Sequence, residues 1–196
     1  MTRSAFVRKL SPLLLLAAGS VASVRAAPAT YTIDPEHTYP SFEADHFVST
    51  WRGKMNKTTG TVVLDRVAQT GSVSIITDLG SIDFGHDKLN DWAIGPEFFD
   101  TPKFPQATYV GTLTHFVKGV PTQVLGNLTL HGATRPLALT INSFTCRPHI
   151  MLKTEWCGAD ASAVFQRDDF GLDAGKRYGM KMEVTLRIQV EALNDT

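Results

Sequence analysis

The stretch KMEVTLRIQVEA, residues 181–192, decides the fold class of this chain. Apolar residues from Met182 to Ala192 occupy every second position, and polar residues from Lys181 to Glu191 occupy the positions between them. Six unbroken alternations are typical of a β-strand, because successive side chains of a strand point to opposite faces of the sheet. A helix would place both kinds of residue on every side. The stretch therefore predicts an antiparallel strand with one buried and one solvated face.

Seven further stretches follow the same rule and are separated by turn sequences. The predicted strands are 41–45, 60–65, 72–77, 107–116, 123–130, 137–144 and 159–166, and the clearest turns are 69–71, 118–121 and 131–136. Many short strands with turns between them favour a sandwich or a barrel. About eight strands close a small barrel that can hold one small ligand. We predict an all-β domain built as an eight-stranded antiparallel barrel.

One segment, residues 86–99, departs from the strand period. Leu89, Trp92 and Ala93 follow helical spacing, and Pro96 limits the helix to about two turns. Asp83 is expected to be the N-cap. The segment predicts a short, aromatic-rich helix that caps one end of the barrel.

The first 26 residues have the composition of a secretory signal peptide. Arg3, Arg8 and Lys9 precede an apolar run over 13–24, which ends in small residues before a cleavage site expected after Ala26. The run is too short for a membrane span, which needs about 20 apolar residues. We predict a signal peptide at 1–26, a single domain at 27–196, and an exported protein without a membrane span after cleavage.

The charge balance of the mature chain argues against nucleic acid as a partner. The leader holds four bases and no acids, so residues 27–196 carry 19 − 4 = 15 bases against 19 acids. Nucleic-acid binding requires clustered Lys and Arg that displace counterions. A net charge of −4 offers no such cluster.

The two cysteines, Cys146 and Cys157, are expected to form a disulfide, because an even cysteine count in an exported chain indicates pairing. Closing so short a loop stabilises by about 3 kcal/mol in the chain-entropy model. A regular hairpin between them would place its turn on Met151 and Leu152, which are poor turn formers. We therefore expect an irregular connection, loosened by Pro148.

The sequence motifs exclude the common catalytic classes. Asp83-Phe84-Gly85 and Asp169-Phe170-Gly171 resemble the magnesium-binding triplet of kinases, but the chain lacks a Gly-rich phosphate loop and a His-Arg-Asp motif. We expect each triplet to be a buried Phe beside a Gly that turns the chain. There is no G-x-S-x-G or H-E-x-x-H motif, and the six histidines have no metal-ligand spacing. We predict no catalytic residues and no metal.

The aromatic residues point instead to an apolar interior. Phe and Trp cluster at positions 42, 47, 51, 84, 92, 98, 99, 104, 165 and 170. They either fill a packed core or, with a closed barrel and a helical cap, surround a dry pocket for a hydrophobic guest. Small residues at expected inward positions, Ala107, Gly111 and Gly126, favour the hollow interior.

Four motifs, in order along the chain, resemble the YceI-like family. They are YTIDPEH at 31–37, FFDTPKFPQA at 98–107, GNLTLHGATRPLAL at 126–139 and RDDFGL at 167–172. The resemblance implies an extended lipocalin-like barrel, periplasmic and often a homodimer, that holds a polyisoprenoid lipid or isoprenoid quinone in an apolar tunnel. The stretch 86–91 lacks the Arg-Asp pair of many relatives, which leaves the lipid head group open.

The residues expected to bind this ligand are Phe42, His46, Phe47, Leu89, Trp92, Phe98, Phe99, Phe104, Gly126, Leu128, Phe165, Arg167, Phe170 and Leu186. No cofactor is expected other than a bound polyisoprenoid or quinone. Two alternatives stay open. One is a lipid-modifying enzyme that uses His46 or Arg167 for acid–base work. The other is an interaction module with a solidly packed barrel that serves a membrane redox partner.

Overall fold

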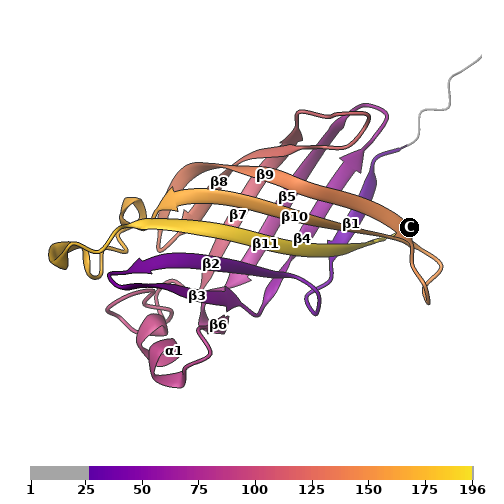
Figure 1. The fold of residues 1–196 in the computed structure, drawn as a ribbon. Helices are drawn as coiled ribbons and strands as arrows, with labels where there is room; N and C mark the ends of the chain where they lie inside the picture. The colour runs from indigo at the N-terminus through magenta and orange to yellow at the C-terminus, as the bar shows by residue number, and fades with distance from the viewer. Residues whose placement is uncertain (1–26, 196) are drawn as a thin grey trace, which may run out of the picture.

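The computed structural model describes residues 27–195, which form a closed antiparallel β-barrel (Figure 1). The barrel strands are β1 (Ala29–Ile33), β4 (Thr58–Asp65), β5 (Thr70–Asp78), β7 (Gln106–Thr114), β8 (Gln123–Leu130), β9 (Ala133–Pro148), β10 (Glu155–Gln166) and β11 (Glu183–Asn194). They pair in this order, and β1 pairs with β11 to close the barrel. The predicted eight-stranded antiparallel barrel is confirmed.

The burial of β11 follows its alternating sequence. Met182, Val184 and Ala192 are buried, whereas Glu183 and Arg187 are exposed. The strand pairs with β10 along its whole length, from Val184 opposite Phe165 to Ala192 opposite Cys157. Its apolar face therefore forms one continuous strip of the inner wall.

Three further strands extend the sheet beyond the barrel: β2 (Tyr39–His46), β3 (Ser49–Met55) and β6 (Ile82–Asp83). One edge of β11 is divided between two partners, because β2 pairs with 184–189 and β1 pairs with 192–194. Thr38, 1% exposed, marks the division, where its Oγ1 donates to the carbonyl of Glu191 (3.1 Å) and accepts from its N–H (3.0 Å). The β2–β3–β6 arm lengthens the wall at one end of the barrel.

The helix α1 (Asp87–Ile94) lies beside β6 at this same end (Figure 1). Its two turns end at Gly95, before Pro96, as the sequence predicts, and Ala93 of the helix is fully buried. The expected N-cap is wrong: His86 occupies that position without a side-chain cap. The Asp83 carboxylate instead accepts the nearby Gly85 N–H at 2.7 Å.

Short 3-10 helices complete the ends: η1 (Leu79–Ser81), η2 (Arg167–Phe170) and η3 (Lys176–Tyr178). In both Asp-Phe-Gly triplets the glycine turns the chain as expected, since Gly85 (φ 71°) and Gly171 (φ 77°) lie in the left-handed region. The expected buried Phe is found only in the second triplet, because Phe84 is half-buried. Phe170 beside Gly171 is 3% exposed.

The β8–β9 connection is tighter than its sequence suggests. The turn predicted over 131–136 is confined to His131 (φ 49°) and Gly132 (φ 77°), and β9 begins at Ala133. Two consecutive residues with positive φ make the two-residue hairpin turn that matches the twist of paired strands. Thr134, Arg135 and Pro136 therefore pair with β8 rather than belonging to a loop.

The predicted disulfide joins Cys146 of β9 to Cys157 of β10. The expected irregular connection is found in the loop, but the expected loosening at Pro148 is wrong, because the cysteines face each other in a regular ladder that continues to Pro148 opposite Glu155. Only 149–154 form the loop, where the Nδ1 of His149 accepts the N–H groups of Met151 (3.1 Å) and Leu152 (2.9 Å). The histidine side chain supplies the acceptor that these poor turn formers lack.

Along residues 27–195, no helix has the length and hydropathy of a membrane span. The predicted signal peptide at 1–26 lies outside the described residues.

Candidate ligand-binding cavity

The barrel encloses a cavity of about 430 Å³. Its lining extends from Tyr31 and Cys157, near the disulfide, to Trp92 of α1 and Arg167 of η2 at the opposite end. The volume lies within the range of about 300–1,000 Å³ that is usual for small-molecule sites. The interior is therefore hollow rather than solidly packed.

The wall is apolar because it is built from the inward positions of neighbouring strands. On β11 these positions are Val184, Leu186, Ile188, Val190 and Ala192. On β10 the lining includes Ala159 and Ala161, whose short side chains leave space along the middle of the cavity. Large side chains on β11 thus lie beside small ones on β10, and the cavity occupies the space that the small side chains leave unfilled.

Eight of the predicted ligand-binding residues line this cavity: Phe42, Trp92, Phe98, Phe99, Leu128, Phe165, Arg167 and Leu186. Six do not: His46, Phe47, Leu89, Phe104, Gly126 and Phe170. The structure thus brings the first group together around one space. That these residues bind a ligand remains a prediction.

Three of the six lie on the β2–β3–β6 arm or on α1, with side chains that are not part of the cavity wall. His46 stacks on Trp51, with ring centroids 3.8 Å apart. Phe47 is 52% exposed and occupies the β2–β3 turn with φ 55°. Leu89 is half-buried on α1, whose lining residue is Trp92. A sequence pattern cannot show which face of the arm and helix meets the barrel.

The other three are occupied by contacts with protein side chains. Phe104 packs on His131 (4.4 Å between centroids), and Phe170 packs edge-on against Phe165 (5.5 Å), which does line the cavity. Gly126 faces the ring of Tyr109, which lies 2.6 Å from where a Cβ would stand. The glycine makes room for a tyrosine and not for a ligand.

Several lining residues were missed by the sequence reasoning, among them Tyr31, Trp51, Phe84, Tyr109 and Ala161. Trp51 and Phe84 belong to the aromatic cluster of the sequence, and that signal was sufficient to include them. Tyr109 is a buried tyrosine of β7. Its hydroxyl donates to the carbonyl of Leu137 (2.9 Å), and burial raises its pKa to about 12.

Arg167 is the first residue of η2 and is 6% exposed. Its Nη1 donates to the carbonyl of Leu172 (2.5 Å) and its Nη2 to that of Ala174 (2.6 Å). The guanidinium also lies 5.9 Å from the ring centroid of Phe98. Burial lowers the pKa of Arg167, but an arginine remains charged in proteins. None of the ion pairs found within 27–195 includes it.

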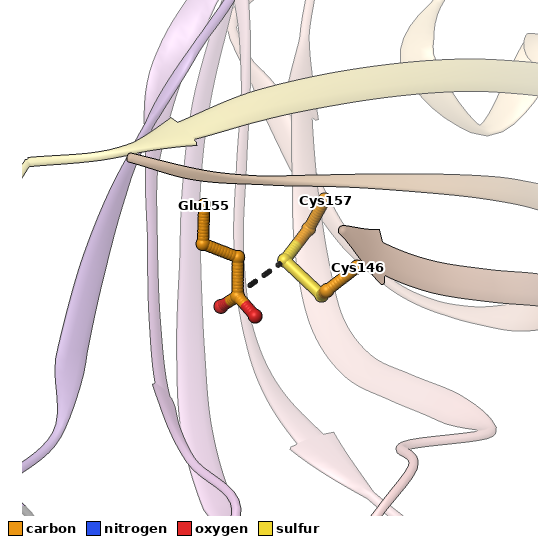
Figure 2. Close-up of side chains that lie close together, drawn as sticks. All are labelled: Cys146, Glu155 and Cys157. Atoms are coloured by element: carbon orange, nitrogen blue, oxygen red, sulfur yellow. Dashed lines mark hydrogen bonds between the residues drawn. A yellow bond between two sulfur atoms is a disulfide. The ribbon is translucent and has the colours of Figure 1, made fainter. Parts of the chain in front are cut away.

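The disulfide end carries a polar cluster, of which Figure 2 shows Glu155 beside the Cys146–Cys157 disulfide. Arg66 Nη2 lies 3.0 Å from Glu155 Oε1 and 2.7 Å from Cys146 Sγ, and the Tyr31 hydroxyl donates to Glu155 Oε1 at 2.6 Å. Burial alone would raise the pKa of Glu155, but the hydrogen bonds from Tyr31 and Arg66 lower it. Cys146, Glu155 and Cys157 are close enough to hold a metal. The disulfide, however, consumes both thiolates that a metal would need.

The YceI-like domain family matches residues 31–192 of this chain. A UPF0312 protein of Yersinia pestis (strain Pestoides F) is 32% identical over 130 residues, which are 64% of this chain and 65% of that relative. The chain thus spans just under two thirds of the relative's length.

Two solved structures share the fold. Burkholderia cenocepacia BcnA superimposes with a TM-score of 0.64 at 22% identity, covering 82% of this chain and 99% of BcnA. A polyisoprenoid binding domain from Saccharophagus degradans, implicated in plant cell wall breakdown, gives a TM-score of 0.60 at 15% identity over 84% of this chain and 98% of the domain. At these identities the likeness concerns the fold.

Proposed function

This chain belongs to the YceI-like domain family, and we propose that it binds the tail of an isoprenoid lipid, a polyisoprenoid or an isoprenoid quinone, inside its barrel and carries it through the periplasm. The observation that carries this proposal is the apolar cavity of about 430 Å³ that extends along the barrel. The polyisoprenoid binding domain of Saccharophagus degradans, which has the same fold, supports the choice of ligand class.

The physical gain of such binding is the removal of an apolar tail from water. Each buried CH₂ gains about 0.8 kcal/mol in transfer from water, although binding recovers only part of this gain. A cavity of about 150 Å³ holds benzene, so about 430 Å³ accommodates about 17 carbon atoms, or three to four isoprene units. The tail of a longer lipid would extend beyond the cavity.

The positions of the two candidate acid–base residues support binding without chemistry. His46 is stacked on Trp51 and is not part of the cavity wall. Arg167 does line the wall, but a guanidinium remains protonated and is a poor proton donor or acceptor at neutral pH. The hollow interior likewise weighs against a packed interaction module.

Binding of prenyl alcohols of increasing length to the delipidated protein tests this function. Ligand efficiencies of about 0.3 kcal/mol per heavy atom predict an increase of about tenfold in affinity per isoprene unit, with a plateau at three to four units. Absence of binding at every length would refute the proposal. Alcohols recovered with an altered mass would identify an enzyme instead.

A further inference from the structure

Arg167 is the only Arg or Lys among the described residues that line the cavity. Removal of a guanidinium from water costs several kcal/mol unless other groups compensate it. The hydrogen-bond acceptors of Arg167 are the carbonyls of Leu172 and Ala174 and the Sδ of Met180 (3.3 Å), which orient the guanidinium but carry no charge. The cavity therefore presents a fixed positive charge inside a wall that is nearly apolar apart from Arg167 and Asp45.

Two of the three acids around Arg167, Asp168 and Asp45, have side chains that are held by other partners. Asp168, Asp173 and Asp45 act on it electrostatically, yet none forms an ion pair with it among the pairs found within 27–195. Asp168 is paired with Lys176 at 2.6 Å. Asp45, which also lines the cavity, accepts the backbone N–H of Lys181 at 3.0 Å. Among the described residues, these carboxylates compensate part of the charge of Arg167 from a distance, but none lies close enough to its guanidinium to form an ion pair.

We propose that Arg167 binds an anionic head group, so that the preferred ligand is a lipid whose apolar tail ends in a phosphate or a carboxylate. This inference rests on the proposed function of the cavity. An oxyanion forms charge-assisted hydrogen bonds with a guanidinium, whereas a neutral hydroxyl or carbonyl leaves its charge uncompensated. Such a pair is strengthened where water is excluded.

The position of Arg167 also assigns a direction to the bound lipid. Arg167 directly follows the last residue of β10, whereas Cys157, which also lines the cavity, lies near the start of that strand. A head group on Arg167 therefore places the tail along the inner faces of β10 and β11, toward the disulfide end. Ala161 and Ile188 lie opposite each other midway along this path.

Three ligands with the same geranylgeranyl tail and a phosphate, carboxylate or alcohol head test the assignment. Wild-type protein should bind the phosphate and the carboxylate at least tenfold more tightly than the alcohol. Arg167→Gln should abolish this preference and leave the affinity for the alcohol within about threefold. Arg187→Gln, which removes an exposed charge on β11, should leave the preference unchanged.

The comparison of the three ligands on wild-type protein tests the inference without any variant. This is needed because Arg167 also holds the backbone at Leu172 and Ala174, so its replacement can disturb the fold. Equal affinity of wild-type protein for all three heads would overturn the head-group assignment and leave the tail-binding function intact. An undiminished preference in a folded Arg167→Gln variant would overturn it too. Preference for the phosphate alone would support the inference and narrow the class to phospholipid-like heads. Failure to bind any of the three would refute the proposed function itself.

Discussion

Filling the middle of the cavity tests where the lipid tail lies. Ala161, on β10, is 7% exposed, lines the cavity and faces Ile188 of β11 on one side and Ile141 of β9 on the other. Ala161→Phe would place a phenyl ring in this space. Because the site is hollow, the larger side chain should cost less than the 1–3 kcal/mol that is usual for overpacking a dense core.

The magnitude follows from the volumes. A benzene-sized group needs about 150 Å³, so the new ring occupies about a third of the 430 Å³ cavity. It excludes about six carbon atoms of the tail. At about 0.3 kcal/mol per atom, the loss is about 2 kcal/mol, or about 20- to 30-fold in affinity for long tails. Tails of one or two units, which still fit, should bind nearly as before, so the plateau should fall by about one unit.

Titration calorimetry with the prenyl alcohol series measures both quantities. The matched control is Val164→Phe on the same strand, at an outward position that is 54% exposed. The control should leave the plateau at three to four units, and thermal unfolding should confirm that both variants fold. A plateau that does not move in Ala161→Phe, or that moves equally in both variants, would show that the tail lies elsewhere.

Three further perturbations test the wall, the disulfide and the buried tyrosine. Leu186→Asp should cost several kcal/mol in chemical denaturation, because it places an unpaired carboxylate in the apolar wall. Arg187→Ala should cost less than about 1 kcal/mol, since its pair with Glu43 is exposed at 3.7 Å; equal losses would contradict the inward and outward assignment. Reduction of Cys146–Cys157 should lower the free energy of unfolding by about 3 kcal/mol, and two free thiols counted in the unreduced, denatured protein would disprove the bond. Because the folded-state pKa of Tyr109 is raised to about 12, the unfolded chain releases this proton first, and wild-type stability should fall relative to Tyr109→Phe as the pH rises above about 10. Parallel pH profiles of the two proteins would refute that reasoning.

The parts of the fold that were predictable are those set by local sequence. The alternation at 181–192 specifies β11, because strand period and burial are read from neighbouring residues. The two-turn α1 was also predictable, since Pro96 limits its length. The strands β1, β3 and β6 were missed. β3, with the sequence STWRGKM, has no clean alternation, and it forms because β2 and β6 pair with it.

The aromatic character of the candidate site was predictable from the sequence, but which aromatic residues line the cavity was not. Aromatic residues such as Phe42 and Phe98 line the cavity, whereas Phe104 packs on His131 and Phe170 packs on Phe165, outside the lining. Their sequence contexts do not differ in a way that separates these two groups, because the difference depends on which side chain stands in front. Gly126 shows the same limit: a small inward residue indicates space, but Tyr109 fills that space from the neighbouring strand.

Native mass spectrometry of the protein purified from bacteria that express the full-length chain, followed by identification of any lipid released on unfolding, tests the central claim most directly. The account predicts one non-covalently bound lipid per chain, with an isoprenoid tail, released with its covalent structure unchanged. The head-group inference further predicts that this lipid is acidic. Protein that is folded but carries no lipid, and that takes up none from a mixture of isoprenoid lipids, would contradict the account.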